Sequence, residues 1–280
     1  MEEIAISTAE FDTFREFFYR KTGISFEPSK RYFVDKRLVE RIEATGHSGF
    51  RGYFTEMRFQ ASGEELQHLT NSMTVNETYF LREEYQFECM VNSILPEIVK
   101  HRKDRRPIRI WAIPSSSGEE PYSIALYLLE RWAGIREWDV EIVSSDIDTG
   151  ILRKARAGRY SARALQHLPA RWREKYFAEV DDEFQLCDDV RRSVEFTRVN
   201  LAEPEDTRAY RNFDLVFCRN LLIYFDDISR KTAGETFFDA LSPGGFICLG
   251  HSESMSRISS LYQIRRFPDA IVYQKPMEPS

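Results

Sequence analysis

Apolar residues near the N-terminus recur every three or four positions, the spacing that places them on one face of an α-helix. Ser7 and Glu10 precede the first face with the spacing of a capping box, and Ser62 and Glu65 repeat that spacing before a later helix. The apolar positions are Phe11, Phe14 and Phe18 in the first helix, Val34, Leu38 and Ile42 in a second that begins near Ser29, and Leu66 and Leu69 in the later one. We therefore expect residues 1–75 to form an all-α N-terminal domain.

From Ile108 onward, short apolar runs alternate with helical segments. Each run is bounded by charged or turn-forming residues, as expected for strands buried on both faces of a parallel sheet. The runs are IRIWAI from Ile108, VEIVSSDID from Val140, FDLVFCRN from Phe213 and GGFICLG from Gly244, and AIVYQK from Ala270 is expected to add an antiparallel edge strand. This alternation predicts an α/β fold over residues 76–280, with ligands bound beyond the carboxyl ends of the strands.

Residues 159–196 interrupt this alternation. They contain a helix-like segment, PARWREKYF, followed by short pieces of alternating pattern. We interpret them as a small inserted β-subdomain. The chain has no internal repeat of the length that marks a solenoid.

Composition narrows the possible functions. The formal net charge of -6 argues against broad nucleic-acid binding, which requires a basic surface. The first residues, MEEIAIST, are acidic where a signal peptide is basic, and no apolar run approaches the ~20 residues of a membrane span. The 4 cysteines form no CxxC pair and have no histidine at ligand spacing, which indicates neither a metal site nor a disulfide framework. We expect a cytoplasmic protein that neither binds nucleic acid nor inserts into a membrane.

The first predicted strand is followed by a polar turn, Ser115–Pro121, at the position where such sheets bind cofactors. The turn has one glycine and two adjacent carboxylates, which suit a cationic cofactor better than a dinucleotide pyrophosphate. Spacing alone favours a capping box between Ser117 and Glu120. Pro121 favours another interpretation, in which proline is the first helical residue and Glu120 faces a ligand from the end of the loop.

Asp146 ends the second predicted strand, where an acid can accept hydrogen bonds from a ribose diol. An N-cap of the next helix is the alternative role for Asp146. Asp148 can provide that cap instead, just before TGILRKARAG. Both interpretations of Asp146 remain open on position alone.

Six motifs occur in order along the chain: TVNETYFLRE, SSSGEEPYSIA, SSDID, VNL, FCRNLLIYF and GHSES. Together they resemble the CheR family of chemotaxis receptor methyltransferases. The likeness covers nearly the whole chain, including the helical N-terminus with its RLVERI segment. It implies an α/β fold with a Rossmann-like sheet, a small inserted β-subdomain and an all-α domain before the sheet. It also implies an enzyme that uses S-adenosylmethionine, releases S-adenosylhomocysteine and needs no metal.

The resemblance also implies a set of site residues. Those implied to bind the cofactor are Asn76, Thr78 and Arg82 from the interdomain linker, Glu120 and Asp146 at its amino-acid and ribose ends, Asn200 and Leu201 beside the adenine, and Arg219 and Asn220, which complete the site. Arg82, Arg219 and Tyr224 are implied to lie closest to the transferred methyl group and to orient the incoming carboxylate. Ile113 and Pro114 depart from the small residues usual in the family.

The implied reaction is methylation of glutamate side chains on the cytoplasmic helical region of membrane chemoreceptors, giving 5-O-methyl esters for sensory adaptation. A glutamate of pKa about 4.3 is almost fully ionised at pH 7, so the reaction needs positioning rather than a general base. The 5 histidines are therefore expected to be catalytically idle. An arginine that holds the substrate is expected to contact one carboxylate oxygen and leave the other free.

Lys30, Arg37 and Arg41 form a narrow basic stripe on the second predicted helix. Such a stripe is usually a solvated face, but the resemblance implies that it docks against the receptor's methylated helices. The inserted segment looks shorter than in relatives that bind a receptor's C-terminal tail peptide. It carries Asp181-Asp182-Glu183 where they have a glycine-rich turn. We expect a monomer that acts independently of such a tail.

Two other functional classes stay open. A catalytically silent signalling module that binds S-adenosylmethionine or S-adenosylhomocysteine and recruits a partner would share the binding residues. A nicotinamide-dependent oxidoreductase is disfavoured, because the three-glycine turn is missing and Glu119 and Glu120 would repel a pyrophosphate. The presence of Arg82, Arg219 and Tyr224 together favours an enzyme.

Overall fold

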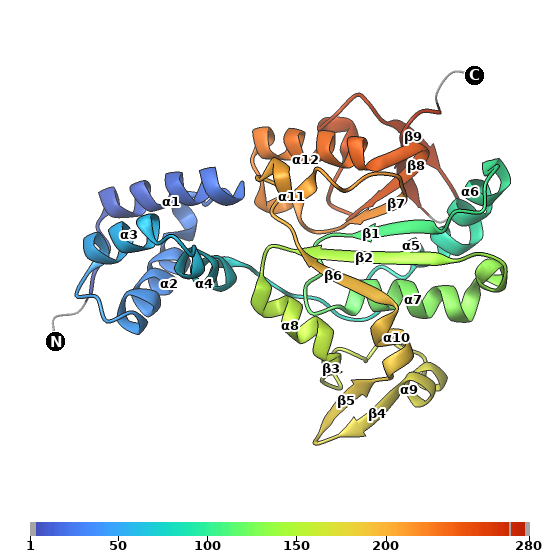
Figure 1. Ribbon diagram of the computed structural model, residues 1–280, viewed down its shortest axis with the longest axis horizontal. Coiled ribbons are helices and arrows are strands. Elements are labelled where there is room, and N and C mark those ends of the chain that lie inside the picture. The colour runs from blue at the N-terminus through green and yellow to red at the C-terminus, as the bar shows by residue number, and fades with distance from the viewer. Residues whose placement is uncertain (1–3, 269, 278–280) are drawn as a thin grey trace.

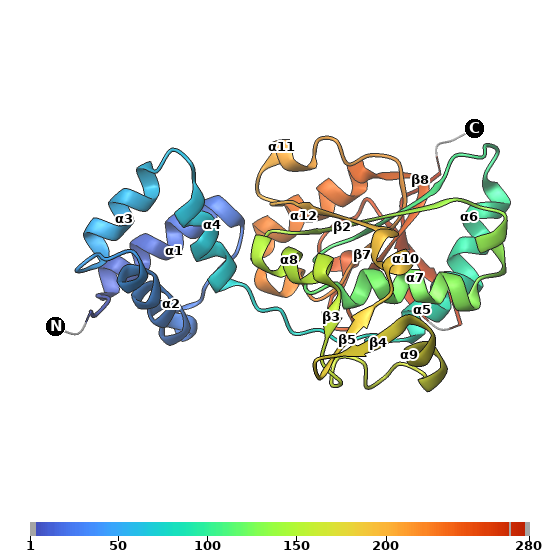
Figure 2. The same ribbon diagram turned by 60° about the horizontal axis from the view of Figure 1, so that its bottom comes forward.

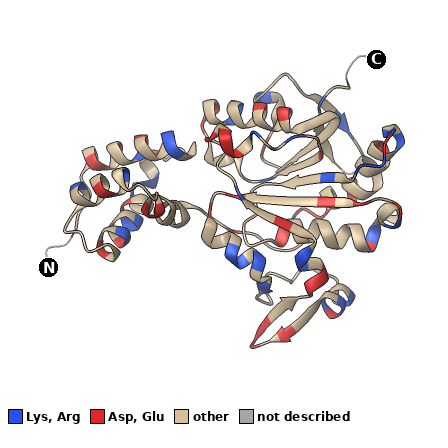
Figure 3. Ribbon diagram, viewed as in Figure 1, with Lys and Arg blue, Asp and Glu red and all other residues tan. Residues whose placement is uncertain are grey.

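The computed structural model describes residues 4–268 and 270–277, which form two lobes (Figure 1). N-terminal helices build the smaller one, the helical lobe. An extended segment leads from it to the sheet lobe, in which helices cover both faces of a sheet (Figures 1 and 2). In the view of Figure 3, acidic and basic residues are interspersed over both lobes. No helix within the described ranges is long and apolar enough to cross a membrane.

The helical lobe confirms the apolar spacing of the sequence. Its helices are α1 (Thr8–Thr22), α2 (Arg31–Ala44), α3 (Phe50–Phe59) and α4 (Glu64–Met73), with a 3₁₀ turn at Pro28–Lys30. Phe14, Phe18 and Leu38 are fully buried where these helices meet. The first capping box is also confirmed, because the Glu10 N–H donates to Ser7 Oγ (3.3 Å) and the Ser7 N–H donates to Glu10 Oε2 (2.8 Å).

The second predicted capping box, between Ser62 and Glu65, is wrong. Helix α4 follows Gly63, which has a left-handed backbone (φ 67°) and no capping side chain, and the Glu65 N–H donates to the Gln60 side chain instead (2.7 Å). Glu65 points into the lobe, where it accepts hydrogen bonds from Arg41 (2.9 and 2.6 Å) and from the Tyr53 hydroxyl (2.8 Å). A two-pronged bond to a guanidinium is stronger than a cap at an exposed helix end.

The main sheet has the strand order β6-β2-β1-β7-β8-β10-β9, and its first five strands run parallel. The strands are β1 (Ile108–Ala112), β2 (Val140–Asp146), β6 (Val194–Arg198), β7 (Phe213–Cys218), β8 (Leu241–Leu249), β9 (Gln263–Arg266) and β10 (Ile271–Gln274). The chain moves outward from β1 in both directions, so the order switches between β1 and β7. A crevice for ligands is expected at that switch, beyond the carboxyl ends of the strands.

The last strand, β10, is antiparallel as predicted, but it is not the edge of the sheet. It lies between β8 and β9, and β9 forms the edge. The sequence analysis missed β9 because its residues are mostly polar or charged, as is common for an exposed edge strand.

Helices cover the two faces of the main sheet. One face packs against α5 (Tyr85–Cys89), α6 (Leu95–His101), α7 (Glu119–Arg131), α8 (Thr149–Ala157) and α10 (Asp188–Arg192), and the other packs against α12 (Asp227–Ala240). A π-helical turn, Met90–Ile94, joins α5 to α6, and the short α11 (Pro204–Thr207) precedes β7. Ile110 of β1 points to one core and Trp111 to the other, as the two-residue period of a strand requires.

The segment interpreted as an insertion contains a small antiparallel sheet of order β3-β5-β4. Its elements are β3 (Arg159–Tyr160), α9 (Ala170–Tyr176), β4 (Phe177–Val180) and β5 (Glu183–Leu186). Residues 194–196 of the expected insertion lie instead in β6, which pairs with β2 of the main sheet. They belong there because Val194 and Phe196 are buried in the sheet's core.

The two lobes meet on both sides of the linker. Asn71 of α4 donates to the Thr149 hydroxyl at the start of α8 (3.0 Å). Near the end of α1, Ile24 forms an antiparallel bridge with Phe225, which precedes α12. These contacts enclose the carboxyl ends of the central strands between the lobes.

We expect Arg41→Ala to destabilise the helical lobe by about 3 kcal/mol, because it leaves the nearly buried carboxylate of Glu65 without its cation. Arg37→Ala serves as the matched control. Arg37 bonds to the Ser72 carbonyl (3.1 Å), so its removal should cost about 1 kcal/mol. Urea unfolding followed by circular dichroism compares the two variants, and equal losses would contradict a structural role for Arg41.

Candidate active site

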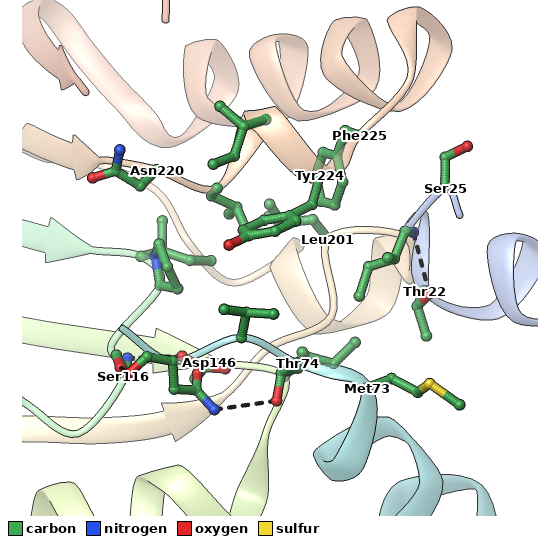
Figure 4. Close-up of a pocket in the computed structure, with 18 of the residues that line it drawn as sticks. Thr22, Ser25, Met73, Thr74, Ser116, Asp146, Leu201, Asn220, Tyr224 and Phe225 are labelled. Carbon is green, nitrogen blue, oxygen red and sulfur yellow. Dashed lines mark hydrogen bonds between the residues drawn. The ribbon is translucent and has the colours of Figure 1, made fainter. Parts of the chain in front are cut away.

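A cavity of about 830 Å³ lies between the lobes, at the carboxyl ends of β1, β2 and β7. Its walls come from the start of the helical lobe, from the linker and from the loops that follow these strands (Figure 4). Figure 4 shows Tyr224 and Asn220 on one wall, with Asp146 and Ser116 on the wall across from them. The cavity occupies the switch point of the sheet, where the topology predicts a ligand.

The loop after β1 turns sharply at Gly118, whose φ is 98°. A Cβ at this position would lie 2.9 Å from the Tyr122 ring and 3.0 Å from the Tyr160 hydroxyl, so glycine is required. The Tyr160 hydroxyl also donates to the Ser117 carbonyl (2.9 Å). The small antiparallel sheet thus touches the loop through β3.

Helix α7 begins at Glu119, two residues before the predicted start at Pro121. Proline is tolerated inside the first turn because the first bond of the helix runs from the Tyr122 N–H to the Gly118 carbonyl (3.0 Å). The alternative capping box is not formed either, since the Ser117 hydroxyl donates to Glu119 (2.6 Å). Glu120 is therefore free to face the cavity from the first turn of the helix.

Glu120 combines a paired and an unpaired oxygen. Its Oε2 accepts a hydrogen bond from Arg219 Nη1 (2.7 Å), whereas the buried Oε1 has no hydrogen-bonding partner among the described residues. Burial raises the pKa of this carboxyl, and the charge of Arg219 opposes that rise. An unsatisfied carboxylate oxygen in a cavity suits a cationic ligand group such as an ammonium.

Arg219 is enclosed, with only 1% of its side chain exposed. Besides Glu120, its guanidinium reaches the Arg82 carbonyl (2.5 Å) and the Glu83 carboxylate (3.3 Å). Burial alone would raise the pKa of Glu83, but the hydrogen bond from His251 and the charge of Arg219 lower it. Both Nη atoms are thus engaged within the protein, and of the guanidinium nitrogens only Nε lacks a partner in the described part of the chain. This arrangement does not support the expectation that Arg219 orients an incoming carboxylate.

Asp146 lies at the end of β2 as expected, and it is buried. Its two oxygens accept backbone N–H bonds from Ser116 (2.8 Å) and Asp148 (3.0 Å). Burial raises the pKa of Asp146 to about 6, against the lowering effect of these bonds. Each oxygen keeps a second lone pair for a ligand hydroxyl.

Asp148 is the N-cap of α8. Its Oδ1 accepts from the Gly150 N–H (2.8 Å) and the Ile151 N–H (2.9 Å). The alternative role of Asp146 as that cap is therefore excluded.

Most of the remaining candidate residues also line the cavity: Asn76, Thr78, Arg82, Asn200, Leu201, Asn220, Tyr224 and Lys30. The side-chain amides of Asn76 and Asn200 are already engaged, with Asp148 (3.0 Å) and with the Lys21 carbonyl of the helical lobe (2.7 Å). Arg37 and Arg41 do not line the cavity, and the guanidinium of Arg41 is held by Glu65.

Arg82 and Tyr224 are the accessible members of the catalytic group. Tyr224 is 37% exposed, and Arg82 donates to the Glu77 carbonyl (3.0 Å) at the surface of the linker. Burial of the Tyr224 ring raises the pKa of its hydroxyl, which therefore stays protonated near neutral pH. These two side chains can meet a group that enters from solvent.

Sequence reasoning missed the wall contributed by the helical lobe. Thr22, Ile24, Phe26 and Phe33 line the cavity, although they precede the linker. Nothing in the sequence indicated this wall, because contacts between two lobes leave no periodic pattern. Ser115 was noted within its motif, and its buried hydroxyl has no partner in the described ranges.

No histidine lines the cavity, and no cluster that could hold a metal ion occurs among the described residues. The cavity is lined by carboxylates, by the cationic side chains of Lys30, Arg82, Arg219 and Arg230, by Tyr224, and by hydroxyl and backbone groups.

Two family models match the chain. The model for the CheR methyltransferase SAM-binding domain matches residues 76–271, and the model for the CheR methyltransferase all-alpha domain matches residues 9–74. Chemotaxis protein methyltransferase 2 of Vibrio cholerae is 56% identical over 277 residues, covering 99% of this chain and 96% of that protein. Chemotaxis protein methyltransferase 2 of Pseudomonas aeruginosa is 35% identical over 93% of this chain and 91% of its own length. The chemotaxis protein methyltransferase of Salmonella typhimurium is 33% identical over 94% and 90%.

We expect affinity for S-adenosylhomocysteine to fall about fivefold between pH 7.5 and pH 5, because Asp146 takes up a proton near pH 6. The sign follows from the ribose hydroxyls, which would donate to the ionised carboxylate and lower its pKa in the complex. Binding therefore strengthens as pH rises through about 6. Isothermal titration calorimetry measures the Kd for S-adenosylhomocysteine over this pH range. The Asp146→Asn variant should bind S-adenosylhomocysteine weakly, with an affinity that depends less on pH. An affinity that does not depend on pH in the unaltered protein would contradict a role of Asp146 in binding the ribose.

Proposed function

Since the chain belongs to the CheR methyltransferase family, we propose that it transfers the methyl group of S-adenosylmethionine to glutamate side chains on the cytoplasmic helical region of membrane chemoreceptors. It is a methyltransferase of the chemotaxis type with a SAM-binding domain. The proposal adds the acceptor, the 5-O-methyl ester product, the cytoplasmic location and a role in sensory adaptation.

Arg82 and Tyr224 both line the cavity, and neither is buried. Their presence together is the observation that most supports a carboxylate acceptor. A cation and a hydroxyl donor can both bind carboxylate oxygens. A hydroxyl or ammonium acceptor would first have to lose a proton, whereas a glutamate of pKa about 4.3 is already ionised at pH 7. The lack of a lining histidine in the described ranges agrees with a reaction that needs no such base.

The cavity also fits S-adenosylmethionine, which supplies an electrophilic methyl group on a sulfonium. Glu120 would accept hydrogen bonds from its ammonium through the unpaired Oε1, and Arg219 holds Glu120 in place. Asp146 would bind the ribose hydroxyls, while Asn200 and Leu201 would flank the adenine.

Orientation of the acceptor falls to the two accessible side chains. We expect Arg82 to bind one oxygen of the substrate carboxylate and to leave the other free to attack, because a two-pronged bond would engage both oxygens. Tyr224 would donate from its protonated hydroxyl. Holding the reacting atoms in line can supply effective molarities of about 10⁵ M or more.

Lys30 ends the 3₁₀ turn before α2 and lines the cavity, whereas Arg37 lies on α2 and donates to the Ser72 carbonyl. We keep both as docking residues for an acidic receptor helix. Arg41 is withdrawn from this docking surface by Glu65.

We also propose that the enzyme acts as a monomer and without a receptor tail peptide. The acidic turn between β4 and β5, on which the second expectation rests, holds Asp181 in an ion pair with Arg159 (3.2 Å).

Labelled methyl from S-adenosylmethionine should appear on receptor-containing membranes and leave as methanol in mild alkali, because carboxyl methyl esters hydrolyse there and methylated nitrogen does not. Scintillation counting of the volatile fraction measures this. Receptors with the acceptor glutamates changed to alanine are the control. Tight cofactor binding without transfer would favour the silent signalling module.

Tyr224→Phe should lower kcat about tenfold, the equivalent of one lost hydrogen bond, while the Kd for S-adenosylhomocysteine stays within about twofold. The ring is kept and only the donor is removed. Initial rates at saturating cofactor, with calorimetry for the Kd, separate the two effects. An equal loss of affinity for S-adenosylhomocysteine would indicate that the Tyr224 hydroxyl binds the cofactor rather than the methyl acceptor.

A further inference from the structure

The carboxylate of Glu253 accepts three backbone hydrogen bonds. Its Oε2 accepts from the Asn220 N–H and the Gly250 N–H (both 2.9 Å), and its Oε1 accepts from the Leu222 N–H (2.8 Å). Glu253 and Gly250 follow β8, whereas Asn220 and Leu222 follow the neighbouring strand β7. One side chain therefore ties together the loops at the carboxyl ends of two adjacent strands.

The tied segment, 219–225, is the loop that supplies Arg219, Asn220 and Tyr224 to the cavity. Its backbone leaves β7 through Asn220 in the left-handed region (φ 57°), an uncommon conformation that neighbouring bonds must hold in place. Its far end meets the helical lobe, where the Ser25 N–H donates to the Tyr224 carbonyl (3.1 Å). The position of this loop thus sets both the cavity wall and one contact between the lobes.

Gly250 allows the carboxylate to reach this position. A Cβ on residue 250 would lie 2.9 Å from Glu253 Oε2 and 3.1 Å from the Asn220 nitrogen. An added methyl group would therefore push the Glu253 carboxylate away from its present position. Gly250 and Glu253 of the GHSES segment therefore act together, although neither of the two belongs to the described lining of the cavity.

We propose that Glu253 is a positioning residue for methyl transfer. Through three backbone N–H groups it holds segment 219–225 in the conformation that presents Arg219 to Glu120 and Tyr224 to the methyl acceptor. The identity of the methyl acceptor rests on the proposed function. The hydrogen bonds of Glu253 and their effect on cofactor binding do not depend on that function.

Two variants disturb the tie in different ways. Glu253→Gln keeps the size of the side chain but turns an accepting oxygen into an amide NH₂ that faces an N–H donor. Gly250→Ala keeps the carboxylate and displaces it with a methyl group. Glu235→Gln is the matched control, because Glu235 lies exposed on α12 with Lys231 at 4.0 Å.

We expect both variants to raise the Kd for S-adenosylhomocysteine about tenfold, the scale of a lost bond to a charged acceptor, and Glu235→Gln to leave it unchanged. Hydrogen exchange followed by mass spectrometry should show faster exchange in 219–225, with β2 unaffected. At saturating cofactor, kcat should remain lowered while the KM for the acceptor stays within about twofold, because the loop orients the acceptor rather than docks it.

The proposal is overturned if both variants bind within about twofold of the unaltered protein, or if loop exchange does not change. Fast exchange in β2 as well as in the loop would also overturn it, because Glu253 would then support the whole fold. Binding and exchange need no methyl acceptor. An unaltered protein that binds S-adenosylhomocysteine but forms no ester would refute the proposed function and leave this test intact.

Discussion

The buried guanidinium of Arg219 is the interaction on which the rest of the site depends. A charge removed from water is costly unless ion pairs and hydrogen bonds compensate it, and here Glu83, Glu120 and the Arg82 carbonyl do so. Over the whole described lining of the cavity, six carboxyl groups stand against four cationic side chains, which leaves a formal excess of negative charge. A ligand that carries an ammonium and a sulfonium neutralises that excess, whereas a pyrophosphate would add to it.

This electrostatic arrangement needs segments that are far apart in the chain. Glu83 comes from the segment that follows the linker, Glu120 from the first turn of α7 and Arg219 from the end of β7. The parallel sheet brings the last two together because the carboxyl ends of its central strands share one edge. The helical lobe then closes the cavity by bonding to the loop after β7 and to the start of α8.

Features that obey local rules could be read from the sequence. The capping box at Ser7 and the buried strands are set by neighbouring residues, so spacing alone found them. For the N-cap of α8, position alone left Asp146 and Asp148 as alternatives, and the structure selects Asp148. The capping-box spacing failed at Glu65, because its partner Arg41 lies 24 residues away and forms a stronger bond than a helix cap. Glu253 could not be interpreted either, because two of its backbone donors lie in the loop after a neighbouring strand and leave no trace in spacing.

The contact between the Tyr160 hydroxyl and the Ser117 carbonyl ties one part of the small antiparallel sheet to the cavity and leaves the rest without that constraint. Its first strand, β3, supports the cofactor loop, so an insertion there would displace Gly118 and the start of α7. The turn between β4 and β5 exposes Asp181 and Asp182, and the ion pair of Asp181 with Arg159 of β3 joins two solvent-exposed side chains. Because loop tips of exposed polar residues tolerate insertions, we expect a longer chain at this turn, such as a genetically fused tag, to leave methyl transfer unchanged.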